Sequence, residues 1–197
     1  MKKIFFLAAF STMIGFAEAQ QLKTPAASPL QTVKQEFGLT AVELSYSRPA
    51  VKGRTIFGDL VPYGKIWRTG ANAATTITFG ENVNFGGKEV PAGKYGLLTI
   101  PNANDWTVIL TKQLNVTSPS AYKEDQDVAR IKITTTDLPF PLESFFISFD
   151  NIRASAMDMI IGWDRTVVIV PITTDVVTKI NAQINSLEGK ENFPYFA

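Results

Sequence analysis

Apolar and polar residues alternate along most of the chain, with the period of two that is typical of β-strands. Turn-forming residues interrupt the alternation about every eight to twelve residues, which is the spacing expected in an all-β sandwich or barrel. The runs that read as strands are 32–37, 42–46, 75–79, 83–85, 88–90, 95–100, 106–111, 128–136, 144–152, 157–163 and 166–172. The pattern predicts an all-β fold, an antiparallel β-sandwich of about eight to ten strands.

Several of these runs carry more detailed expectations. Gly38 marks a turn between the first two strands, and Gly86-Gly87 predicts a two-residue hairpin. The run 128–136 alternates as a half-exposed strand does, whereas 166–172 is almost continuously apolar and is predicted to be central in its sheet. We find no internal repeat and no second domain boundary, so residues 30–173 are predicted to form one domain.

The period changes near the C-terminus. Four apolar residues recur there at helical spacing: Val176, Ile180, Ile184 and Leu187. Gly189 is a typical stop signal, so the pattern predicts a helix over 174–189 with a tail over 190–197. The apolar stripe of this helix is expected to pack on the sandwich.

The first nineteen residues have the pattern of a secretory signal peptide. Lys2-Lys3 precede an apolar run over 4–16, and residues 17–19 match an A-x-A cleavage site. The run is short for a permanent membrane anchor, although a retained signal anchor is the alternative, and no later stretch reaches transmembrane length. We expect an exported protein, periplasmic or extracellular, with no transmembrane anchor after signal removal and a flexible arm over 20–29.

Residues 46–72, with the sequence YSRPAVKGRTIFGDLVPYGKIWRTGAN, interrupt the strand pattern. Five basic residues and one acid are interleaved there with apolar residues, glycines and prolines, and no strand or helix period runs through the segment. A coil of this length inside a domain is usually either functional or disordered. This one has too many aromatic and branched residues to be disordered, so we predict an ordered loop with a small core of its own.

The chain has no histidine and no cysteine. Ser-His-Asp and Cys-His nucleophile pairs are therefore excluded, as are zinc sites with histidine or thiolate ligands and covalent haem attachment. An enzyme built from this sequence would depend on carboxylates, lysine, tyrosine or serine. We predict no cofactor and no metal.

Charge is balanced over the whole chain but not locally. The sequence has 19 basic and 18 acidic residues, and removal of residues 1–19 would leave 17 of each. A neutral protein is not expected to bind nucleic acid. Segment 46–72 nevertheless carries a net charge of +4. This charge must form a local cationic surface or pair with carboxylates from the strands.

Two interpretations of segment 46–72 remain open. In the first, arginine forks and aromatic faces converge on a small polar or anionic ligand or a glycan. The candidate ligand-binding residues are Arg48, Arg54, Tyr63, Trp67, Arg68 and Asn72. In the second, the three arginines bind loop carbonyls and strand carboxylates, because irregular backbone needs many donors, and Trp67 closes one end of the sandwich. Most arginines are expected to face inward, with Arg68 and Trp67 as the exceptions.

The acidic and aromatic residues offer further interpretations. Glu124, Asp125 and Asp127 are spaced as calcium ligands can be, but the glycine and final glutamate of an EF-hand loop are missing, which favours a solvated loop face. A carboxylate pair for glycoside hydrolysis is defined by its separation in space and cannot be located from sequence. Trp67 or Trp106 could stack on sugar rings, although a core position is commoner for tryptophan.

Three stretches closely resemble a bacterial family filed as domain of unknown function number 2911: residues 46–72, PAGKYGLLTIP at 91–101 and TVVIVPI at 166–172. The resemblance covers roughly residues 28–175. It implies an exported bacterial protein with a mainly β fold, often followed by a helical extension, and it supplies no activity, catalytic residue or cofactor. Members often carry a tryptophan-glycine pair ahead of the tyrosine in the second loop, where this chain has Ser118-Pro119 before Tyr122.

Three functional hypotheses follow from these observations. The first is a non-enzymatic, exported binding module whose segment 46–72 holds a small polar ligand, a glycan or an envelope partner. The second is a carboxylate-dependent hydrolase acting on envelope polysaccharide, which requires two acids about 5 to 10 Å apart beside that segment. The third is a structural role, in which the arginines of the segment serve the fold alone.

Overall fold

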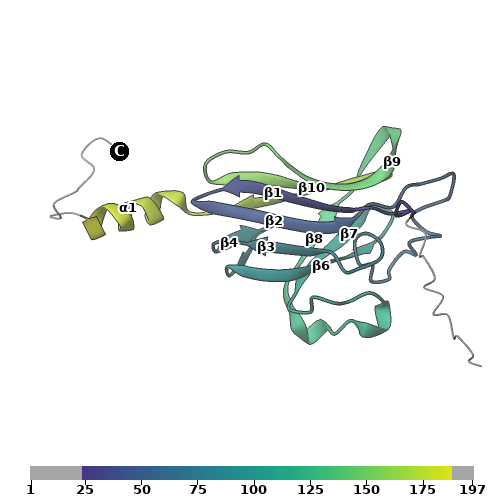
Figure 1. The fold of residues 1–197 in the computed structure, drawn as a ribbon, viewed down its shortest axis with the longest axis horizontal. Helices are drawn as coiled ribbons and strands as arrows, with labels where there is room; N and C mark the ends of the chain where they lie inside the picture. The colour runs from purple at the N-terminus through teal and green to yellow at the C-terminus, as the bar shows by residue number, and fades with distance from the viewer. Residues whose placement is uncertain (1–23, 188–197) are drawn as a thin grey trace, which may run out of the picture.

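The computed structural model describes residues 24–187, in which ten strands form two antiparallel sheets and a helix follows at the C-terminal end (Figure 1). The six-stranded sheet has the order β1 (Leu30–Phe37), β2 (Thr40–Ser47), β3 (Thr76–Phe79), β6 (Gly93–Pro101), β7 (Asp105–Thr111) and β8 (Asp127–Thr134). The four-stranded sheet has the order β5 (Lys88–Val90), β4 (Val83–Phe85), β10 (Ala156–Thr173) and β9 (Thr136–Asp150). The sheets are not closed into a barrel, so the predicted all-β sandwich is confirmed.

The remaining elements are short. Helix α1 (Val176–Leu187) follows β10, and two 3-10 turns, Pro119–Ala121 and Glu124–Gln126, lie in the loop between β7 and β8. The predicted signal peptide over 1–19, the first residues of the expected arm, the predicted helix stop at Gly189 and the tail over 190–197 lie outside the described residues.

The main core lies between the two sheets, because alternate residues of each strand point into it. In β2 the inward positions are Val42, Leu44 and Tyr46, each at most 1% exposed. A second, smaller cluster lies on the outer face of the six-stranded sheet, where Leu98 and Ile109 are covered by Val116. The loop between β7 and β8 is therefore an ordered cover over that face.

The local turn predictions agree with the structure. β1 and β2 pair from Leu30↔Ser47 to Phe37↔Thr40 around the turn at Gly38. Gly86-Gly87 connects β4 to β5 as the predicted two-residue hairpin. Strand β10 lies between β4 and β9, which gives the apolar run 166–172 the central position expected of it.

Strand β10 differs from the prediction of two separate strands over 157–163 and 166–172. It is one strand of 18 residues. The strand continues through the polar residues Asp164 and Arg165, where its pairing with β9 shifts register twice. Its partner β9 is also longer than predicted, because the edge of a sheet tolerates prolines such as Pro139 and Pro141 that would interrupt a central strand.

The expectation that the C-terminal helix packs along the sandwich is wrong. Of the residues in α1 only Val176 is buried, whereas Val177, Ile180 and Ile184 are 69%, 41% and 37% exposed. Figure 1 shows the helix leaving the end of the sandwich along its long axis. The helical period in the sequence thus predicted the helix correctly, but it did not predict that the apolar face of the helix is exposed.

Candidate functional site

The six candidate residues lie between β2 and β3, in a loop (residues 48–75) at the end of the sandwich opposite to α1 (Figure 1). Isolated bridges tie this loop to both sheets: Ala50 pairs with Ser144 of β9, and Trp67 pairs with Thr99 of β6. The loop therefore spans the two layers of the sandwich. Its order comes from backbone pairing at both attachments, as well as from its own residues.

The loop has the small core that the sequence predicts. Ile56 and Val61 are 0% and 4% exposed, and a tight turn brings them together. The N–H of Val61 donates to the carbonyl of Ile56 at 2.9 Å, and the N–H of Gly58 donates to the carbonyl of Val61 at 2.9 Å. Phe57 extends from this turn into the main core of the sandwich.

Trp67 lies in a cluster of aromatic rings between the sheets. Its ring stacks on Trp163 of β10, with centroids 5.8 Å apart and planes at 17°, and it packs against Trp106 and Phe145 from two other strands. Its indole N–H donates to the carbonyl of Gly70 at 3.0 Å. Trp67 is thus half-buried and closes this end of the sandwich, as the structural interpretation expected.

The arginines bind carbonyls, and the predicted pairing with strand carboxylates is wrong. Arg48 Nε donates to the carbonyl of Phe145 at 3.0 Å, and Arg68 Nη1 donates to the carbonyl of Asn72 at 3.0 Å. Arg54 donates to two carbonyls of the preceding turn. Within residues 24–187 none of the three forms an ion pair. Irregular backbone leaves many carbonyls without partners, and these are the closest acceptors.

Asn72 and Tyr63 have local structural contacts. The amide of Asn72 donates to the carbonyl of Ser28 at 3.0 Å, and the N–H of Arg48 donates to the carbonyl of Pro29 at 2.9 Å. These bonds hold the last two residues of the expected N-terminal arm. Tyr63 is 46% exposed, and its ring lies against Gly58.

Three of the six candidates, Arg54, Trp67 and Arg68, meet in one cleft of about 240 Å³, called here the loop cleft. Arg48, Tyr63 and Asn72 do not line it. The remaining lining residues are Ser28, Pro49, Leu60, Val61, Gly70, Ala71 and Trp163. Among residues 24–187 no acidic residue lines the cleft, so no carboxylate of the described chain neutralises its two arginines there.

The loop cleft is lined by hydrogen-bond donors that are only partly used. A guanidinium has five N–H groups, and within residues 24–187 Arg54 uses two of them and Arg68 one. Trp163 is 1% exposed, and its indole N–H has no acceptor among the described residues. That nitrogen is itself buried, so the donors that a ligand in the cleft can reach are those of Arg54 and Arg68. Sequence reasoning missed Trp163 because it comes from β10 and carries no local signal.

The backbone is strained next to Arg68 of the loop cleft. Thr69 has φ of 54°, although a β-branched residue is disfavoured in the left-handed region. Its hydroxyl donates to Thr99 Oγ1 at 3.1 Å, and its carbonyl accepts from Thr75 Oγ1 at 2.8 Å. These bonds between fully buried threonines fix the backbone that carries Trp67 and Arg68. Residues held in this way are concentrated at ligand-binding and active sites.

A second recess of about 60 Å³ lies on the other loop. It is lined by Ile66, Trp67 and Arg68 on one side and by residues 116–119 on the other. Like the loop cleft, it has no acidic lining residue. In the part of the chain that the structure describes, neither cleft is therefore lined by the carboxylate pair that the hydrolase hypothesis requires.

The acidic run in the second loop is not uniformly solvated. Glu124 and Asp125 are exposed, but the side chain of Asp127 is only 6% exposed and pairs with Arg130 at 2.9 Å. Tyr122 also donates to this carboxylate. In the part of the chain that the structure describes, no group of three acidic residues is arranged to hold a metal ion.

The Tyr122 phenol predicts a pH dependence of stability. Burial, and then the Asp127 carboxylate, raise its pKa above the ordinary value of about 10. Because the folded-state pKa exceeds the unfolded one, the stabilisation is complete below about pH 10 and is lost as the pH rises further. Urea unfolding between about pH 9 and pH 11 should show a falling free energy, with a shallower fall for Tyr122→Phe; equal slopes would contradict this role.

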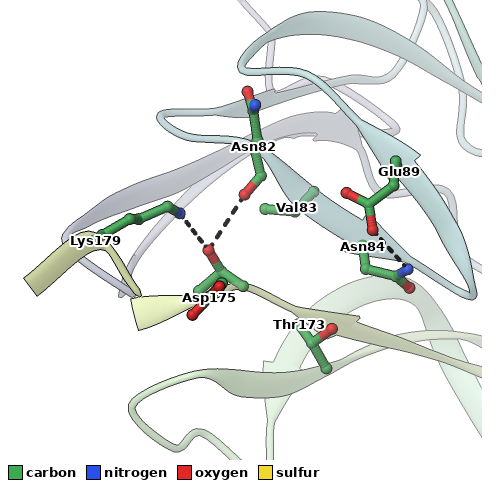
Figure 2. A pocket seen from close by; sticks show the side chains of 8 residues that line it. Asn82, Val83, Asn84, Glu89, Thr173, Asp175 and Lys179 are labelled. Atoms are coloured by element: carbon green, nitrogen blue, oxygen red, sulfur yellow. Dashed lines mark hydrogen bonds between the residues drawn. The ribbon is translucent and has the colours of Figure 1, made fainter. Parts of the chain in front are cut away.

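A different cleft, of about 440 Å³, lies where α1 joins the sandwich (Figure 2). Lys179 of α1 pairs with Glu81 at 2.8 Å and donates to Thr174 Oγ1 at 2.6 Å. Asn84 donates to Glu89 Oε1 at 3.1 Å across the β4–β5 hairpin. The polar side chains in Figure 2 thus largely bind one another and hold the start of the helix, and no aromatic residue lines this cleft.

The fold and the loop cleft define a class of protein: a two-sheet β-sandwich with one long cationic loop that forms an aromatic-walled cleft at its end. The chain belongs to the family described as "Protein of unknown function (DUF2911)", whose model matches residues 28–172. This match confirms the resemblance seen in the sequence. No curated protein and no solved structure matches the chain significantly. Within residues 24–187, no helix is long and apolar enough to cross a membrane.

Proposed function

We propose that the protein is an exported, non-enzymatic binding module whose loop cleft holds a small anion. The observation that carries this proposal is the lining of the cleft within residues 24–187: two arginines with unused N–H groups, and no carboxylate. Such donors are satisfied together by a ligand that accepts hydrogen bonds and carries negative charge.

Export to the periplasm or the exterior rests on the signal-peptide pattern of residues 1–19. A non-enzymatic role is supported by the sequence, which has no histidine or cysteine, and by the two clefts beside the loop, which have no acidic lining residue. The hydrolase hypothesis loses its main requirement, because general acid and base both need a carboxylate at the site.

The structural role of the loop is the second candidate, and the carbonyl bonds of the arginines favour it. The two candidate functions predict different roles for Arg68. If the loop serves the fold alone, the unused N–H groups have no role and no anion stabilises the protein. If the cleft binds an anion, ligand affinity depends on Arg68 more strongly than the fold does.

The arginines can be tested by substitution. We expect Arg68→Ala and Arg54→Ala each to weaken anion binding about tenfold or more, because a hydrogen bond to a charged group contributes about 1.5–3 kcal/mol. Lys65→Ala is the matched control, since Lys65 is an exposed cation of the same loop that does not line the cleft. Affinity for acetate, phosphate and sulfate would be measured by calorimetry at constant ionic strength.

The outcomes separate the two candidates. Unchanged affinity in both arginine variants, or equal losses in Lys65→Ala, would show unspecific attraction and overturn the site. If Arg68→Ala does not fold, Arg68→Lys keeps a cation but loses the fork, and weaker binding by that variant would support the proposal. Failure of all three anions to bind the wild-type protein would leave the structural role as the better account.

A further inference from the structure

The walls of the loop cleft are more apolar than an anion alone requires. Six of its ten lining residues are apolar: Pro49, Leu60, Val61, Trp67, Ala71 and Trp163. One of them, Leu60, is 44% exposed and so offers apolar surface to a ligand in the cleft. Sites for small organic molecules have this composition, with mostly apolar walls and a few placed polar groups.

The polar side chains of the cleft are almost all donors. The side chains of Arg54 and Arg68 carry N–H groups and no acceptor, and among residues 24–187 Ser28 has the only side-chain hydroxyl in the lining. A sugar presents several hydroxyl groups whose protons need acceptors, and carboxylates or amides normally supply them. A carboxylate ligand needs donors only. The lining therefore matches a simple carboxylate better than a sugar, or than a sugar acid, whose hydroxyl groups would also need acceptors.

The size of the cleft limits the ligand. A volume of about 240 Å³ corresponds to roughly eight water molecules at about 30 Å³ each. This space is sufficient for a carboxylate group with a short alkyl chain or a single ring. It is too small to enclose an oligosaccharide or a folded peptide.

From these three features we infer that the ligand is a small amphiphilic acid, a carboxylate with an alkyl chain or ring. Its carboxylate binds at Arg54 and Arg68, and its apolar part lies against Leu60 and Val61. This inference rests on the proposed function, because it specifies which anion the loop cleft accepts. It adds that affinity comes from apolar burial as well as from charge.

The chain-length dependence of binding tests the inference. Calorimetry with acetate, butyrate, hexanoate and benzoate, at constant ionic strength, should show affinity rising by up to about fourfold for each methylene buried. Leu60→Ala should weaken hexanoate binding severalfold and leave acetate unchanged. Leu114→Ala is the matched control, because Leu114 is also 44% exposed but does not line the cleft; it should change neither affinity.

Each contrary result has a distinct meaning. Equal affinities for acetate and hexanoate, or tighter binding of galacturonate than of hexanoate, would overturn the inference while leaving an anion site in place. Equal affinities for hexanol and hexanoate would refute anion recognition and thus the proposed function itself. Equal losses in Leu60→Ala and Leu114→Ala would refute the assignment of Leu60 to the ligand.

Discussion

Replacing Trp67 with alanine is expected to lower the free energy of unfolding by up to about 3–5 kcal/mol, the range for truncating a large core aromatic residue. Trp67 contacts Phe57, Trp106, Phe145 and Trp163, so its loss removes packing from both sheets and from the loop. The total stability of a domain is about 5–15 kcal/mol, and this single change is a large part of it. Urea unfolding monitored by circular dichroism measures the effect.

Tyr63→Ala is the matched control for this prediction. Tyr63 is an aromatic residue of the same loop, but it is 46% exposed and lies outside the cluster. Its truncation should change the free energy of unfolding by no more than about 0.5 kcal/mol. A loss for Trp67→Ala as small as that for Tyr63→Ala would mean that the loop contributes little to the core.

Trp67→Ala should alter the loop cleft as well as lower the stability of the fold. Trp67 also lines the loop cleft, and the bond from its indole to Gly70 holds the turn beside Arg68. A variant that still folds would therefore have an altered cleft. Trp67 thus belongs both to the aromatic cluster and to the lining of the loop cleft.

The sequence predicted the elements whose signal is local. The alternation in β2 and the glycines at 38 and 86–87 depend on neighbours within a few residues, and these predictions agree with the structure. The ordered core of the long loop was predicted for the same reason. Segment 46–72 contains its own apolar residues, and Ile56 and Val61 form that core with bonds inside one short turn.

The parts that sequence reasoning missed depend on distant neighbours. Trp163 joins the loop cleft only because β10 lies opposite Trp67, and no local pattern reports that pairing. The partners of the arginines were missed in part for a similar reason. Charge counting favours carboxylates as partners, whereas the fold places free carbonyls closer. Helix α1 shows the same limit, since an apolar stripe predicts burial only where a surface is available.

Gly38→Ala is expected to destabilise the protein by about 2–4 kcal/mol. Gly38 lies in the turn between β1 and β2, next to Glu81 and to Thr174, which precedes α1. Its φ is 62°, a conformation that costs an L-residue about 1–2 kcal/mol. A Cβ there would lie 1.8 Å from Oε1 of Glu81, so the carboxylate must move. That carboxylate is only 10% exposed and pairs with Lys179, and moving it breaks the pair that holds α1.

Gly53→Ala separates the backbone cost from the cost of moving Glu81. Gly53 has φ of 70°, close to that of Gly38, but nothing lies within 4 Å of a Cβ at that position. Its substitution should cost only the conformational term of about 1–2 kcal/mol. Glu81→Ala removes the nearest obstacle, so in that background Gly38→Ala should destabilise the protein by nearly as little as Gly53→Ala does. Urea unfolding of the wild type, Gly38→Ala, Glu81→Ala and the double variant gives the coupling energy between the two sites. Additive costs would mean that Glu81 and the hairpin turn are independent.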